Sequence, residues 1–148
     1  MSSLYASSVI SYAAASLMVE AAVAAALADE APVCVAVLDI HGRLKAFAAM
    51  DGSSVIAQDM SQRKAYTALL GLSSEGLGEA IQPQPSMLAS FAAQDRVALI
   101  GGGLPIIVAG QLVGAIGVGG AQTEQDVAFA QAALAALAVT EQGNNRQA

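Results

Sequence analysis

The stretch VCVAVLDIHGRLKAFAAM, residues 33–50, decides the fold. Its first six residues are apolar and rich in valine, which is typical of a strand that is covered on both faces or central in a sheet. Residues 39–42 (Asp-Ile-His-Gly) then supply turn chemistry, because Asp accepts hydrogen bonds from the backbone downstream and Gly accommodates positive φ. Leu44–Met50 returns as a second strand, so we predict an antiparallel hairpin.

A helix precedes this hairpin and a helical segment follows it. Apolar residues spaced by three and four predict a first helix that ends near Asp29, because Pro32 disfavours helix in the residue before it. After the hairpin we predict helices over 55–70 and 73–81 and one or two helical turns within 86–94, with 82–85 as an extended connector. The predicted buried stripe of the first helix is Ile10, Ala14, Leu17, Ala21, Ala24 and Ala28.

The C-terminal third is predicted to hold three strands and a helix. The strands are 97–100, 104–108 and 111–118, and the helix runs from 123 to about 141, opened by a near capping box of Thr123 and Asp126. Gly114 and Gly117 weaken the last strand unless another backbone or a ligand approaches closely there. Residues 142–148 are predicted to form a flexible tail.

This order of elements predicts one α+β domain over residues 1–148, with a core of about 4–141. The strands come as a pair and a trio, whereas parallel winding separates strands by helices. We therefore expect a five-stranded antiparallel sheet, flanked by N- and C-terminal helices and carrying a helical insertion between strands 2 and 3.

The composition points to self-association and away from several partner classes. Hydrophobic residues make up 55% of the chain and charged residues only 12%, so little solvated surface is left for a monomer and a homo-oligomer is expected. The net charge of −6 disfavours nucleic acid and anionic membrane surfaces. Glu20 interrupts the alanine-rich run 13–28, and no basic residue precedes it, so no membrane segment is predicted.

The small number of cysteines and histidines indicates where the protein is located and whether it can bind a metal ion. Cys34 is the only cysteine, so no disulfide framework indicates secretion, and a cytoplasmic protein is the default expectation. One cysteine and one histidine also form no metal-ligand cluster, so no metal site is predicted. Cys34 itself is expected to be an inert buried thiol.

Short motifs in a fixed order resemble the GlcG/HbpS family, also known as the haem-degrading, DUF336 or PduO C-terminal-like family. The resemblance covers about residues 4–138 and implies a profilin-like or roadblock-like fold in homo-oligomers. It also implies kinship with haem-binding accessory proteins and with proteins found beside small-molecule catabolic enzymes. Ala49 and Gly119 depart from the Arg and Ser that are common in the family, so no site that relies on those side chains is carried over. The matching motifs lie at 35–44, 50–52, 64–68, 102–106, 110–118 and 125–126.

The candidate ligand-binding residues combine a scarce cation with a glycine loop: Lys64, Thr67, Gly102, Gly103 and Pro105. If Lys64 faces inward its ammonium needs a partner, which a ligand carboxylate could provide; if it faces outward it is ordinary solvated surface. The glycine loop can present N–H groups to an anion, or it can simply form a tight turn between strands. Thr67 adds a hydroxyl on the same helix, and Pro105 belongs to one of the matching motifs.

Three further side chains have a chemical and a plain interpretation. His41 is the only histidine, so it is either solvent-exposed at the hairpin tip or the axial ligand of a haem held without a covalent C-x-x-C-H attachment. Asp39 and Asp51 are explained by turn stabilisation and lack a visible catalytic partner.

The sequence predicts a small-ligand-binding accessory or sensory homo-oligomer, with haem or a small carboxylate as the ligand. The alternative is an enzyme that acts on a small organic acid by proton transfer or lyase chemistry, with Lys64 as its polar anchor. A third class is a purely structural assembly module. The sequence does not choose among ligands, and the cofactor stays undetermined with haem as the candidate.

Overall fold

The hairpin predicted over residues 33–50 is present in the computed structural model, which describes residues 1–148. Its strands pair antiparallel from Cys34 opposite Ala49 to Leu38 opposite Leu44. The first strand then pairs antiparallel with a later strand, so it is central in the sheet and buried along its whole length. The elements are α1 Tyr12–Ala28, β1 Cys34–Asp39, β2 Leu44–Ala49, α2 Val55–Ala68, α3 Ser74–Ile81, α4 Pro85–Ala92, β3 Gly103–Val108, β4 Gln111–Gly119 and α5 Thr123–Gln147.

The sheet has four antiparallel strands in the order β2-β1-β4-β3, one fewer than predicted. The predicted strand over 97–100 is wrong, because its backbone bonds to a helix and a turn instead of a strand. The N–H of Ala98 donates to the Thr67 hydroxyl, and the N–H of Val97 donates to the carbonyl of Gln94. The fold is therefore α+β with five helices, of which α2, α3 and α4 come between β2 and β3.

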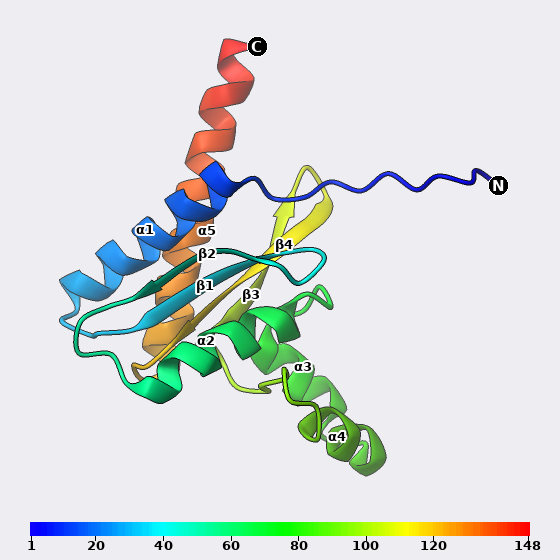
Figure 1. Ribbon diagram of the computed structural model, residues 1–148, viewed down its shortest axis with the longest axis vertical. Coiled ribbons are helices and arrows are strands. Elements are labelled where there is room, and N and C mark those ends of the chain that lie inside the picture. Colours follow the sequence, from blue (N-terminus) through cyan, green and yellow to red (C-terminus); the bar gives the residue numbers. More distant parts are fainter.

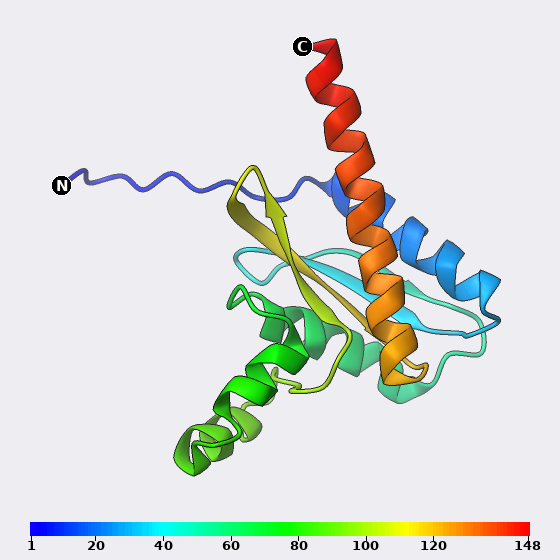
Figure 2. The ribbon, with the colours of Figure 1, turned by 180° about the vertical axis from the view of Figure 1, so that it is seen from behind.

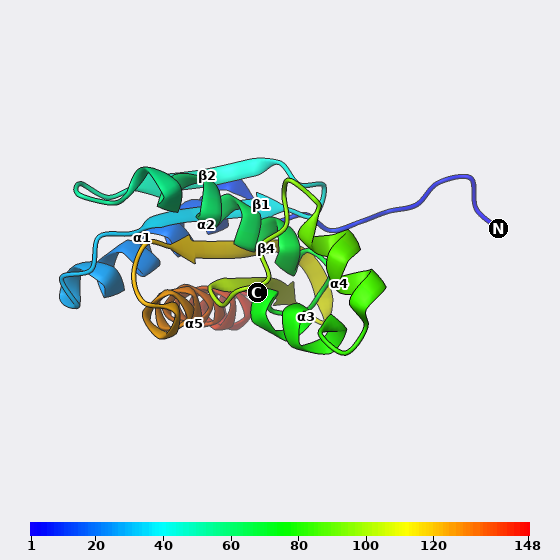
Figure 3. The same cartoon turned by 90° about the horizontal axis from the view of Figure 1, so that it is seen from below.

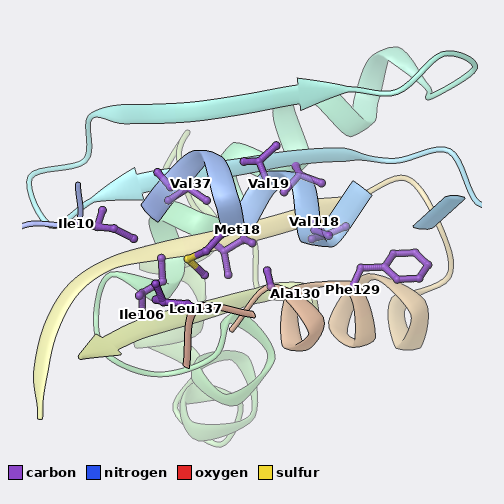
Figure 4. Packing of buried hydrophobic residues seen from close by; sticks show 14 of the residues in the cluster. Ile10, Met18, Val19, Val37, Ile106, Val118, Phe129, Ala130 and Leu137 are labelled. Atoms are coloured by element: carbon purple, nitrogen blue, oxygen red, sulfur yellow. The ribbon is translucent and has the colours of Figure 1, made fainter. Parts of the chain in front are cut away.

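Helices cover the two faces of the sheet unequally (Figures 1 and 2). On one face α1 and α5 pack against each other and enclose a core of larger apolar side chains, including Met18, Ile106 and Phe129 (Figure 4). On the other face α2 lies across β1, β4 and β3. Seen from below, α5 is viewed nearly end-on below the strands, and α3 and α4 project to one side of the sheet (Figure 3).

Helix α2 lies on small residues because its backbone comes very close to the sheet. A Cβ added at Gly117 would collide with the carbonyl of Ser61, and one at Gly103 would collide with the carbonyl of Lys64. The expectation that another backbone approaches β4 at Gly117 is therefore confirmed. This close approach fixes where the α2 side chains lie relative to β3 and β4.

Three expectations about the helices need correction. The buried residues of α1 are Ala15, Met18, Val19, Ala22 and Ala26, not the predicted stripe. The many alanines make its faces nearly alike, so Met18 and Val19, the larger side chains, determine which face is buried. Ile10 is buried, but it lies before the helix, and its N–H donates to the carbonyl of Val113.

Helix α5 also differs from the prediction at both ends. Its N-cap is Gln122, whose N–H donates to the Gln125 side chain, so the predicted cap at Thr123 is displaced by one residue. At the other end the helix continues to Gln147 through the segment predicted to be a tail. A local hydrogen-bond ladder needs no tertiary partner, and a Cβ at Gly143 would meet nothing within 4 Å. None of the helices is long and apolar enough to span a membrane.

Candidate functional site

The main cavity, about 550 Å³ in volume, lies where the β1–β2 turn, the C-terminal half of α2 and the segment between α4 and β3 meet. We call it the hairpin cleft. Its volume lies in the range of small-molecule sites, and like them it combines an apolar wall with a few polar groups. The apolar wall comprises Ile40, Leu69, Leu70, Leu77, Phe91 and Val97, and the polar side chains are His41, Tyr66, Thr67, Gln94, Asp95 and Arg96.

The β1–β2 turn places His41 at this cleft. The Asp39 side chain is buried, and its Oδ1 accepts hydrogen bonds from the N–H of His41 at 2.8 Å and of Arg43 at 3.0 Å. Gly42 takes a φ of 80°. The turn chemistry predicted for Asp39 is thus confirmed, and it fixes the backbone of His41. The residue is exposed, as expected for a hairpin tip, and it also lines the cleft.

Arg96 connects the turn to α2 across the same cleft. Its guanidinium carbon lies 3.9 Å from the centre of the Tyr66 ring, a cation–π arrangement. Its Nη2 donates to the carbonyl of Gly42 over 3.4 Å, which is a long hydrogen bond. The cleft therefore has an imidazole and a guanidinium among its lining groups, beside an apolar wall.

Lys64 faces inward, and its partner comes from the chain itself. Its side chain is 3% exposed, and Nζ donates to Asp126 Oδ2 at 2.8 Å and to the carbonyl of Val118 at 2.9 Å. Asp126 Oδ1 accepts the N–H of Ala121 at 3.1 Å. Burial raises the pKa of the Asp126 carboxyl, although the hydrogen bond and charge of Lys64 oppose that shift.

The structure brings Lys64 and the glycine loop together. Gly102 has a φ of 127°, and a Cβ there would lie 2.9 Å from Lys64 Nζ. The carbonyl of Gly102 accepts the N–H of Val118, and the N–H of Gly103 donates to Ser74 Oγ at 2.9 Å. The Gly103 donor that was expected to face an anion is thus bonded within the chain. An anion-binding role for this corner stays a prediction.

Thr67 lies one helical turn after Lys64 on α2, whereas Pro105 lies in β3. Thr67 is buried, donates to the carbonyl of Arg63 at 2.8 Å and accepts the N–H of Ala98 at 2.9 Å. It lines the hairpin cleft. Pro105 lies in β3 and lines a different groove, beside α5.

Sequence reasoning missed two residues that shape these sites. Asp126 was assigned to a helix cap, yet its carboxylate is the counter-ion of Lys64. The local sequence around Asp126 does not indicate this ion pair, because Lys64 and Asp126 are 62 residues apart in the sequence. The sequence patterns do not single out Arg96, although it is one of only six cations and lies four residues after the end of α4.

Comparison with known proteins identifies the family of the chain. The family model described as "Haem degrading protein HbpS-like" matches residues 10–135. The chain belongs to the HbpS-like family. The resemblance of its motifs to the GlcG/HbpS family is thereby confirmed.

Relatives with solved structures share the fold over most of this chain. The Klebsiella pneumoniae protein ORFY is 33% identical, with a TM-score of 0.87 over 93% of this chain and 97% of that one. A PduOC structure described as a haem complex is 29% identical, with a TM-score of 0.79 over 86% of this chain and 94% of that one. An uncharacterised 15.0 kDa protein of Citrobacter freundii, from the dhaT-dhaS intergenic region, is 39% identical over 84% of this chain and 89% of its own length.

Proposed function

We propose that this chain binds haem in the hairpin cleft, without a covalent link, and that His41 is the axial ligand. The observation that carries the proposal is that the only imidazole in the chain lines the main cavity. Neutral imidazole is a common axial ligand of haem iron. The family description and the PduOC haem complex add independent support.

The residues that line the cleft fit haem. Leu69, Leu70 and Phe91 contribute apolar surface for a flat macrocycle, and the guanidinium of Arg96 can balance the charge of its carboxylates. Bound haem would supply a redox-active iron, and the chain would act as an accessory or sensory protein. The cleft is open, with His41 and Arg96 exposed, so we expect weak binding.

A haem titration followed at the Soret band tests the proposal, with two matched variants on one hairpin. His41→Ala should shift or abolish the band of the bound pigment. Arg43→Ala should leave it unchanged, because the Arg43 side chain is exposed and does not line the cleft. If the wild-type chain binds no haem, the proposal fails. If the spectrum of His41→Ala equals that of wild type, His41 is not the ligand.

A small carboxylate is the second candidate ligand, and Arg96 is the observation that favours it. The guanidinium lies among the groups that line the cleft and can donate to a carboxylate in a charge-assisted pair. The enzyme alternative requires Lys64 as its polar anchor, and the pairing of that residue with Asp126 leaves it without support.

We also propose that the chain forms a homo-oligomer. Several large apolar side chains are exposed far from the cleft, including Val55, Ile56, Ile107 and Val139. The N-terminal arm extends away from the domain and exposes Leu4 and Tyr5 (Figure 1). A second copy of the chain that covers some of these side chains would remove their apolar surface from water.

A further inference from the structure

Arg96 is a cation without a carboxylate partner in a chain that has twice as many acids as bases. The sequence holds 12 acidic and 6 basic residues. Two ion pairs are present, and they use Arg63 and Lys64, with Asp59 and Asp126 as partners. Arg96 is held instead by the Tyr66 ring and by one long hydrogen bond to the carbonyl of Gly42.

This arrangement leaves most of the guanidinium donors free while limiting its motion. A guanidinium has five N–H donors, and only one bond from Arg96 to the protein is present. Stacking on Tyr66 at 3.9 Å holds the plane beside the cleft, so little side-chain entropy is lost when a ligand binds. A ligand carboxylate could replace the weak Gly42 contact with two parallel hydrogen bonds.

The rest of the cleft determines what the carboxylate must be attached to. Leu69, Leu70, Leu77 and Phe91 line it together with Arg96. A small hydrophilic acid leaves that apolar surface uncovered, whereas a ligand with a large apolar body covers it and gains the corresponding burial energy.

We infer that Arg96 is a specificity-determining residue, which selects apolar ligands that carry a carboxylate over neutral ligands of the same shape. The inference rests on the proposed function only in taking the hairpin cleft as the ligand site. It does not depend on haem iron or on His41. Metal-free porphyrins therefore separate the two ideas.

The experiment compares protoporphyrin IX with its dimethyl ester by fluorescence titration. The wild-type chain should bind the diacid about tenfold more tightly than the ester, as expected for one charge-assisted pair at an exposed site. Arg96→Gln should weaken diacid binding about tenfold and leave ester binding unchanged. Arg96→Lys should keep part of the preference, because it keeps the charge but loses the planar donor set.

Arg43→Gln is the control, since it removes a neighbouring exposed arginine that does not line the cleft, and it should preserve the full preference. Equal binding of both porphyrins by the wild-type chain would overturn the inference. So would an Arg96→Gln variant that weakens both porphyrins alike, because Arg96 would then only shape the cleft. If neither porphyrin binds, the cleft as a ligand site fails together with the inference. If the tenfold preference holds but the Soret band of bound haem is the same for wild type and His41→Ala, only the assignment of His41 as axial ligand is wrong.

Discussion

Replacing Lys64 by Met separates a structural from a ligand-binding role for this lysine. The variant keeps the unbranched side chain, shorter by one atom, but leaves the Asp126 carboxylate buried without its counter-ion. Breaking a buried pair in this way costs about 3–5 kcal/mol of unfolding free energy. For a chain of 148 residues this lowers Tm by roughly 6–20 °C. Urea unfolding and a thermal melt measure both quantities.

The stability that Lys64→Met loses should increase with pH. Burial raises the pKa of Asp126 in the folded chain above its value in the unfolded chain. The protonated carboxyl therefore contributes its full stability below pH 3.8, and this contribution is lost as the pH rises through the higher folded pKa. Without Lys64 the folded pKa rises further, since two of the opposing influences are gone. The stability gap between wild type and Lys64→Met should therefore widen from pH 4 to pH 8.

A double variant checks that the effect belongs to the pair. Asp126→Asn keeps an oxygen for the N–H of Ala121 but removes the charge, so Lys64→Met with Asp126→Asn should cost less than the sum of the two single changes. The reasoning is refuted if Lys64→Met melts within 1–2 °C of wild type (roughly the effect of half a kcal/mol). In that case a large loss of carboxylate affinity would favour the role in anion binding that the sequence predicts for Lys64 and the glycine loop.

Two further predictions concern the seating of α2 and the assembly. Gly117→Ala should lower Tm strongly, because the new methyl group meets the carbonyl of Ser61. The same change at the open Gly143 should leave Tm equal or slightly higher. Equal Tm values of the two variants would contradict the close packing of α2 on the sheet. Light scattering in moderate salt should give a mass several times 14.8 kDa, and a monomer across micromolar concentrations would contradict the proposed oligomer.

The part of the fold that the sequence predicts well is the part governed by neighbouring residues. The hairpin over 33–50 was predicted because valines and the Asp-Ile-His-Gly turn act within a few positions of each other. The supposed strand at 97–100 has a similar apolar composition, but its backbone partner is the hydroxyl of Thr67, 31 residues away from Ala98. No local pattern distinguishes the two.

The candidate site also depends on contacts between residues that are far apart in the sequence. The distance between Lys64 and the glycine loop does not follow from the sequence, and only the resemblance to the family predicts that they contribute to one site. The counter-ion Asp126 was missed, because an acid in the first turn of a helix is explained equally well by the helix dipole. Arg96 was missed because its stacking on Tyr66 depends on how α4 returns to the sheet.

The glycines beneath α2 make the two walls of the hairpin cleft unequal in mobility. One wall belongs to a helix whose backbone rests on the sheet at Gly103 and Gly117, so it can neither slide nor tilt without lifting off the strands. The opposite wall includes Phe91 of α4, a helix with no buried residue, whose local opening needs little free energy. We therefore expect a ligand that bridges the two walls to order α4 more than α2.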